Sequence, residues 1–155
     1  MSAALNTEVV FDTALLELNS RLRTARTRLP LRSDEDVVGL RRQVRERAVA
    51  IALSLVDQTK LVTAASELAR NTIKYGGGGE AMLDALEDGF KRGVGLIFID
   101  NGPGIPDLDQ ALRDGFTTGG GLGLGLGGSK RLVDEFEIDS RPGEGTAVSV
   151  VKWKR

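Results

Sequence analysis

The sequence of 155 residues contains neither cysteine nor histidine. Without cysteine there can be no disulfide, no thiolate nucleophile and no cysteine-ligated zinc site. Without histidine there can be no Ser-His-Asp or Cys-His arrangement and no phosphorelay carried by histidine. Any catalysis must therefore use carboxylates, amides, hydroxyls, lysine or arginine, backbone groups and a bound cation.

An excess of one charge and long hydrophobic runs are also lacking. The 21 basic and 22 acidic residues leave a formal net charge of −1, so no overall field draws the chain to nucleic acid or to an anionic membrane. No run of 18 apolar residues and no basic-then-apolar N-terminus occurs, which predicts neither a transmembrane helix nor a Sec signal. We therefore expect one cytoplasmic domain with no nucleic-acid or membrane partner.

Glycine, by contrast, is in local excess. Of the 20 glycines, 17 lie between Gly76 and Gly128. Such a concentration indicates backbone that turns tightly or comes close to another group. Leucine, isoleucine, phenylalanine and aspartate are interleaved with these glycines, so the segment does not have the composition of a flexible linker.

Residues 7–29 carry an apolar stripe at intervals of four, three, four, three and four residues. The stripe consists of Phe11, Leu15, Leu18, Leu22, Ala25 and Leu29. This spacing predicts a helix that ends at Pro30. We therefore divide the chain into an N-terminal helical extension (1–30) and a main domain (31–155). The stripe could pack on that domain, pack on a symmetry mate or dock another protein.

The remaining elements predict an α+β layer rather than alternating βαβ units. A helix is expected from the N-cap Ser33 through Leu55, and a second from about 58 to 75. Residues 80–88 are ambiguous between helix and strand. The later elements, in chain order, are a buried strand at 94–99, a helical turn at 108–112, a helix at 129–136, and strands at 137–140 and 145–153.

Two segments carry side chains suited to chemistry. Glu67 and Asn71 stand one turn apart on one helix face, where the amide could ligate a hard cation and the carboxylate could position or deprotonate a hydroxyl. A solvated helix face would explain this pair without any function. Asp100 leaves a buried strand into Asn-Gly-Pro-Gly-Ile-Pro, where it could accept from an exocyclic amine beside a planar base; a tight turn is the alternative.

The third segment is the glycine run 119–128, directly before a predicted helix. Free backbone N–H groups at such a position bind anions. A disordered glycine loop is the alternative, although leucines at every second position argue against it. The run does not follow a strand and it ends in Gly-Ser-Lys, so it is neither a dinucleotide fingerprint nor a P-loop.

The order of these segments is more specific than any one of them. A helical Glu-x-x-x-Asn is followed by Asp-x-Gly-x-Gly after a strand, by Gly-x-Gly-x-Gly before a helix, and by Gly-x-Gly-Thr at Gly143–Thr146. This order resembles the GHKL ATP-binding fold of gyrase B, Hsp90, MutL and histidine kinases, over roughly residues 31–155. The resemblance implies a two-layer α/β sandwich whose mixed, mainly antiparallel sheet has helices on one face.

Four longer motifs resemble the RsbT branch of bacterial serine/threonine kinases and anti-sigma regulators. They are Glu67-Leu-Ala-Arg-Asn71, Asp100-x-Gly-Pro-Gly-Ile-Pro106, Asp114-Gly-Phe-Thr-Thr118 and Lys130-Arg-Leu-Val-Asp-Glu-Phe136. The resemblance implies an ATP- and Mg²⁺-dependent kinase that phosphorylates serine or threonine on STAS-domain proteins of a stress-signalling complex, the stressosome. It also implies activation of a PP2C-type phosphatase.

The resemblance further implies a role for each matching residue. Glu67 would be the catalytic carboxylate and Asn71 the Mg²⁺ ligand, while Asp100 would read the adenine amino group in a base pocket formed by glycines. The other implied nucleotide contacts are Gly102, Gly104, Thr118, Gly121, Leu122, Gly123, Leu124, Gly125, Lys130 and Thr146. A solvent-exposed lysine would explain Lys130 equally well.

Two other functions are compatible with parts of this pattern. The chain could be an anti-sigma factor, or a phosphatase-activating binding module, whose nucleotide site is regulatory. Tyr75-Gly76 stands where many anti-sigma relatives carry His-Gly, which weakens the case for direct sigma-factor binding. A pure ATPase is disfavoured because no transducer domain is present, and the absence of histidine excludes a histidine kinase.

Overall fold

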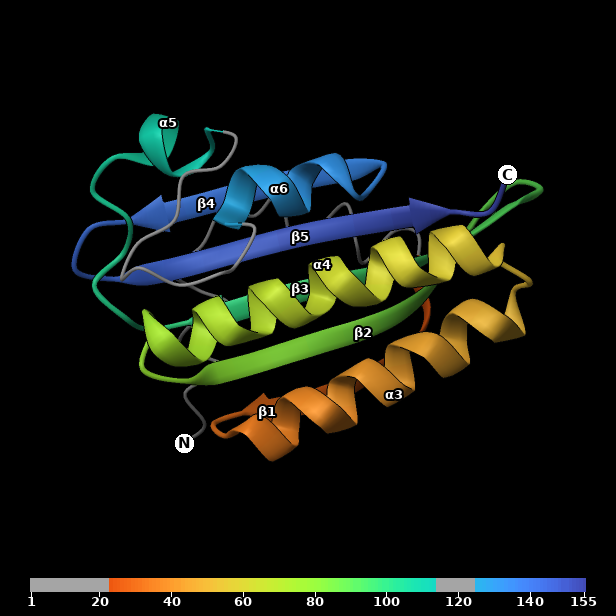
Figure 1. Cartoon of the computed structure of the whole chain (residues 1–155), viewed down its shortest axis with the longest axis horizontal. Coiled ribbons are helices and arrows are strands. Elements are labelled where there is room, and N and C mark those ends of the chain that lie inside the picture. The colour runs from red at the N-terminus through yellow and green to blue at the C-terminus, as the bar shows by residue number, and fades with distance from the viewer. Residues whose placement is uncertain (1–22, 114–124) are drawn as a thin grey trace.

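The computed structural model describes residues 23–113 and 125–155. They form two layers, a five-stranded sheet and a set of helices over one of its faces (Figure 1). The strand order is β1-β2-β3-β5-β4, and all four neighbouring pairs are antiparallel. The elements are β1 (Arg23–Leu31), α3 (Asp34–Ala50), α4 (Leu55–Lys74), β2 (Gly79–Asp88), β3 (Lys91–Asp100), α5 (Leu108–Ala111), α6 (Gly125–Arg131), β4 (Glu135–Arg141) and β5 (Gly145–Trp153). The α+β prediction is confirmed.

The main core lies between the sheet and helices α3 and α4. Leu40 and Val44 of α3 and Leu61 and Leu68 of α4 are buried against strand residues such as Phe98. The buried residues of α4, which include Leu61, Leu68 and Ala69, therefore form the face that packs on the sheet. This packing turns the opposite edge of α4, which carries the Glu-x-x-x-Asn pair, away from the core.

The two long helices begin at serine caps. The Ser33 hydroxyl accepts from the Asp36 N–H at the start of α3, as its capping-box sequence predicts. α3 ends at Ala50 rather than reaching Leu55, because Ala52 takes a positive φ of 60° and Ser54 caps α4 instead. A left-handed residue cannot continue a right-handed helix, so the connection between the two helices is short.

Replacing Gly39 by alanine is expected to stabilise the protein by about 0.5–1 kcal/mol. Gly39 lies in the interior of α3, and a Cβ added there would meet nothing within 4 Å. The substitution therefore removes backbone entropy from the unfolded chain without creating a clash. Urea denaturation followed by circular dichroism measures the change. A lower midpoint at unchanged slope would contradict it.

The N-terminal prediction is wrong over 23–29, because these residues belong to strand β1 and not to a helix. β1 is an edge strand paired with β2. Its Pro30, which cannot donate to a ladder, is tolerated at an edge. Arg26 of β1 forms a bidentate ion pair with the fully buried carboxylate of Asp84 on β2, at 2.7 and 3.0 Å.

The spacing was misleading because Leu29 fits a helical period and also a two-residue alternation with the fully buried Leu31. Pairing with β2 decides between the two periods, and this pairing is not local in sequence. The boundary drawn between residues 30 and 31 falls inside β1. Residues 7–22, the rest of the apolar stripe, lie outside the described residues.

Two further elements differ from the sequence expectation. Residues 80–88, ambiguous by propensity, form β2 because β1 and β3 flank them on both sides. The helix expected at 129–136 is α6, which begins four residues earlier and ends at Arg131. Asp134 already pairs with β5 through its N–H to the Val151 carbonyl and its carboxylate to the Trp153 N–H, so the chain enters β4 at Glu135.

The other strands and the helical turn at α5 lie where the sequence predicts them. In the part of the chain that the structure describes, no helix is both long and apolar enough to cross a membrane.

Candidate active site

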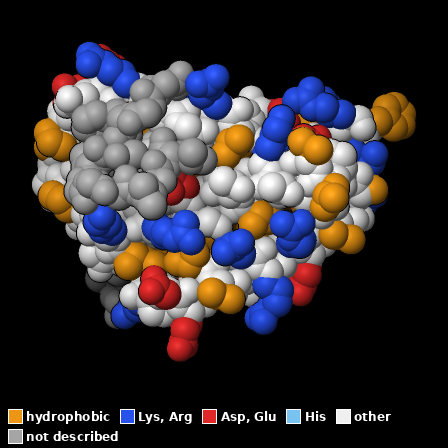
Figure 2. Space-filling model, viewed as in Figure 1, with side chains coloured by type: hydrophobic (Ala, Val, Ile, Leu, Met, Phe, Trp, Pro, Cys, Tyr) orange, Lys and Arg blue, Asp and Glu red, His pale blue; other side chains and the backbone are white. Residues whose placement is uncertain are grey.

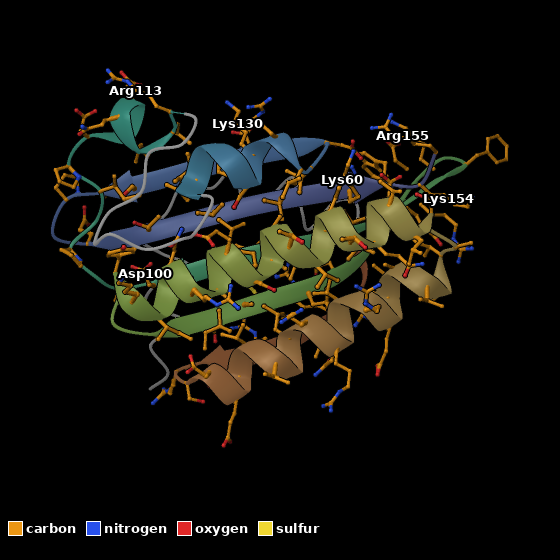
Figure 3. All side chains as sticks on the ribbon, viewed as in Figure 1. Lys60, Asp100, Arg113, Lys130, Lys154 and Arg155 are labelled. Carbon is orange, nitrogen blue, oxygen red and sulfur yellow. The ribbon has the colours of Figure 1, made fainter. Side chains whose placement is uncertain are left out.

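Asp100 is the last residue of β3, and its carboxylate is largely buried, with 8% of the residue exposed (Figure 3). The Gly102 N–H donates to its Oδ1 at 2.9 Å, and the Thr146 backbone N–H also donates to the carboxylate. Burial raises the pKa of Asp100, while these two hydrogen bonds lower it in part. The site therefore holds a desolvated acceptor at the end of a central strand.

Three glycines pack against Asp100 from different segments. A Cβ on Gly76 would lie 2.5 Å from the Asp100 Oδ2, and one on Gly102 would lie 2.7 Å from the Gly76 Cα. Gly145, at φ +133°, has no room for a side chain because a Cβ there would overlap the Asp100 carbonyl oxygen. Sequence reasoning named Gly102 but missed Gly76 and Gly145, although both lie in glycine clusters that were noticed.

The loop after β3 is tied to β4 and β5. Gly104 adopts a φ of +78° with its α-carbon against the Arg141 carbonyl. The Ser140 hydroxyl accepts from the Ile105 N–H at 2.7 Å and lies 2.9 Å from the Thr146 Oγ1. Thr146 therefore makes two contacts at this end of the sheet: its hydroxyl pairs with Ser140, and its backbone N–H donates to the Asp100 carboxylate. Ser140 was missed, and no motif in the sequence marks it.

Glu67 and Asn71 are both half-buried on α4, one turn apart. The Glu67 Oε2 accepts from the Gly125 N–H at 3.3 Å, which joins the carboxylate to the first residue of α6. The backbone carbonyl of Asn71 accepts from the N–H of Gly76 at 3.3 Å. α4 therefore brings the carboxylate to the glycine-rich segment and leads directly into the turn that contacts Asp100.

The remaining expected residues are placed differently. Lys130 is exposed in the last turn of α6, and Figure 3 shows it well separated from Asp100. Thr118, Gly121, Leu122, Gly123 and Leu124 lie outside the described residues. Within 23–113 and 125–155, no group of three or more aspartate or glutamate side chains could hold a metal ion by itself. A magnesium ion that keeps water and phosphate ligands needs only one or two protein groups.

These contacts define an arrangement with two chemically different carboxylates. Asp100 is buried, held by backbone donors and surrounded by glycines, which suits recognition of a flat, amine-bearing group. Glu67 is half-buried next to the start of α6 and has an amide neighbour one turn away, which suits proton acceptance or cation binding.

The comparison with protein families identifies the domain. Residues 56–155 match the family described as histidine kinase-, DNA gyrase B-, and HSP90-like ATPase. The match begins in the first turn of α4 and includes every described residue of the candidate site. A domain of this kind binds ATP.

Characterised relatives are kinases and anti-sigma factors. The chain is 46% identical to serine/threonine-protein kinase RsbT of Bacillus subtilis over 120 residues, covering 77% of this chain and 90% of the relative. It is 35% identical to an anti-sigma F factor of Bacillus licheniformis over 104 residues, covering 62% of this chain and 69% of the relative.

Two solved structures share the fold at low sequence identity. The structure of the RsbU and RsbW domains of Rv1364c from Mycobacterium tuberculosis matches with a TM-score of 0.57 at 21% identity, covering 83% of this chain and 32% of that one. The SiaB–SiaC complex from Pseudomonas aeruginosa matches with a TM-score of 0.52 at 14% identity, covering 93% and 99%. The chain belongs to the family of histidine kinase-, DNA gyrase B- and HSP90-like ATPases and, within it, to the RsbT-like serine/threonine-protein kinases.

Proposed function

We propose that this kinase binds ATP with Mg²⁺ at the candidate site and phosphorylates serine or threonine on a STAS-domain protein. The observation that carries the proposal is the desolvated Asp100 carboxylate, held by two backbone donors among close-packed glycines. The Glu67–Asn71 pair on α4 supports it, because α4 leads directly into the turn that contacts Asp100.

The residues around Asp100 fit an adenine ring. An ionised carboxylate accepts from the exocyclic amine, and Gly102 and Gly104 let the loop after β3 pack closely on the Gly76 and Arg141 backbones beside Asp100. Thr146 orients the carboxylate through its N–H, and its own hydroxyl is paired with Ser140. The hydrogen bond between the adenine amine and Asp100 would contribute strongly to the binding free energy, because the carboxylate is already desolvated and cannot be satisfied by solvent.

Glu67 and Asn71 fit the reacting end of the nucleotide. When bound, Mg²⁺ and ATP supply the charge neutralisation and the phosphoryl group of the reaction. The Asn71 amide oxygen would hold the cation. Glu67 would orient the substrate hydroxyl and accept its proton. The Glu67 Oε2 is bonded to the Gly125 N–H in this structure, so the other oxygen of this carboxylate, Oε1, would face the hydroxyl.

The RsbT resemblance also implies the protein partners. A STAS-domain protein would present the acceptor serine or threonine, and a PP2C-type phosphatase would be activated by the released kinase. Positioning by the partner is an effective way to catalyse phosphoryl transfer, since the reaction needs little covalent chemistry from the enzyme.

A partner-binding module with a regulatory nucleotide site is the second candidate. A specific surface favours it: an open groove of about 430 Å³ lined by Arg41, Arg42, Arg45, Glu46, Val49 and Val62. Figure 2 shows lysine and arginine alternating with hydrophobic side chains over α3 and α4. Such a surface suits an acidic protein, whether that protein is a substrate, a phosphatase or a sigma factor. Transfer of labelled phosphate from ATP to a STAS protein would decide for the kinase.

Calorimetric titration with ATP and Mg²⁺ is expected to show binding that depends on Asn71. Asn71→Ala should weaken the affinity for the magnesium complex by about tenfold or more, because the cation loses a protein ligand. Affinity for ATP in excess EDTA should not change. Lys60→Ala serves as the matched control, since Lys60 is exposed on the same helix and Figure 3 shows it well separated from Asp100. Equal losses with and without magnesium would remove Asn71 from cation binding.

A further inference from the structure

Four consecutive glycines, Gly76–Gly79, connect α4 to β2, and the proposed function gives none of them a role of its own. Gly77 and Gly78 have φ values of +75° and +98°, so their lack of a side chain is explained by the turn. Gly76 has no positive φ that would require glycine. At Gly76 a side chain is excluded for a different reason, because the space that a Cβ would need is already occupied.

That space is filled by the Asp100 carboxylate. A Cβ on Gly76 would lie 2.5 Å from Oδ2 and 2.6 Å from Cβ of Asp100, and its three nearest neighbours are all atoms of this side chain. On its other side the Gly76 backbone abuts Gly102, where a Cβ would lie 2.7 Å from the Gly76 Cα. Gly76 is thus enclosed between the carboxylate and the loop that donates to it.

The surrounding hydrogen bonds leave little freedom to move. The Gly76 N–H is bonded to the Asn71 carbonyl, and the Asp100 Oδ1 is bonded to the Gly102 N–H. An alanine at 76 could reach ordinary contact distance only if the carboxylate or the turn shifted by about 1 Å. A shift of that size in a positioned polar group is enough to lose about a hundredfold in function.

We propose that Gly76 is a positioning residue that sets the orientation of the Asp100 carboxylate and thereby the preference of the site for a base carrying an amino group. This inference rests on the proposed function, in which Asp100 reads adenine. The glycine turn after α4 would then contribute to the nucleotide specificity of the site together with the end of β3.

The test compares ATP with inosine triphosphate, in which a carbonyl replaces the 6-amino group. Calorimetry with magnesium gives both dissociation constants for the wild type and for Gly76→Ala. The wild type is expected to prefer ATP by tenfold or more. Gly76→Ala should lose most of that ratio through weaker ATP binding, while inosine triphosphate, which reports the phosphate contacts, binds within about twofold of the wild type.

Gly77→Ala is the matched control. Gly77 has a φ of +75°, where alanine is strained, but a Cβ there would meet nothing within 4 Å, so the substitution strains the same turn without touching the carboxylate. This variant should melt at a lower temperature and keep the ATP preference. The inference is overturned if Gly76→Ala keeps the wild-type ratio, or if Gly77→Ala loses it equally.

A stability measurement keeps the inference testable if Gly76→Ala folds poorly. In an Asp100→Gly background the carboxylate is gone, so Gly76→Ala should lower the melting temperature much less than it does in the wild type. An undiminished loss would overturn the contact. If the wild type itself binds ATP and inosine triphosphate equally, the adenine-reading role of Asp100 in the proposed function fails, independently of Gly76.

Discussion

Replacing Glu67 by glutamine is expected to lower the rate of phosphoryl transfer by about 10²–10⁴-fold, with ATP affinity within about twofold of the wild type. Glutamine cannot accept the proton of the substrate hydroxyl. It does retain an oxygen that can accept from the Gly125 N–H, the contact that Glu67 makes at 3.3 Å. The variant therefore separates proton acceptance from the attachment of α4 to α6.

Glu67→Ala provides the comparison, because it removes both the carboxylate and the Gly125 contact. Single-turnover transfer of labelled phosphate to a STAS protein measures the rate, and calorimetry measures ATP binding. Both variants should show this loss of rate, and only the alanine variant should also melt at a lower temperature. A glutamine variant with wild-type rate beside an inactive alanine variant would show that Glu67 serves only to anchor α6.

Asp100→Asn is expected to weaken ATP binding by about 10- to 100-fold, the loss of a hydrogen bond to a charged acceptor. The Asn carbonyl can take the Gly102 N–H that Asp100 Oδ1 accepts at 2.9 Å. Its amide then places a donor toward the adenine amine, so two donors face each other. Calorimetry with ATP measures the loss, and unchanged affinity would remove Asp100 from base recognition.

The same substitution is expected to raise thermal stability at neutral pH. Burial raises the pKa of Asp100 above its ordinary value of 3.8, so the folded state holds this proton more tightly than the unfolded state does. The stabilising contribution is complete below pH 3.8 and is lost as the pH rises through the raised folded pKa. Asn carries no charge, and the difference in melting temperature, variant minus wild type, should therefore grow between pH 4 and 7. A constant difference would contradict the burial argument.

The places of Glu67, Asn71 and Asp100 in the fold could be predicted because each stands next to a strong local signal, whereas their roles were implied only by the family resemblance. Glu67 and Asn71 are opposite an apolar arc of helical period, and Asp100 ends a continuous apolar run. Both patterns depend on neighbours in sequence. The structure places these residues on α4 and at the end of β3 as the patterns indicate.

The features that were missed depend on contacts between distant segments. Residues 23–29 were predicted as helix because their pairing with β2 leaves no local trace in the sequence. In that pairing Arg26 lies opposite Asp84, which is more than 50 residues away along the chain. Ser140 acts through Ile105 and Thr146, and neither contact can be inferred from the residues around it. The closeness of Gly76 to Asp100 likewise exists only once β2 and β3 are paired.

If Asp100 reads adenine as proposed, the cost of holding its ionised carboxylate in the fold links the lifetime of the protein to its nucleotide supply. Chains without ATP would then carry a buried carboxylate that lacks its ligand, and any ligand that binds only the folded state shifts the folding equilibrium toward it. Chaperones and proteases act on the unfolded fraction. A cell short of ATP would therefore hold fewer copies of this kinase as well as less active ones, so that abundance and activity decline together.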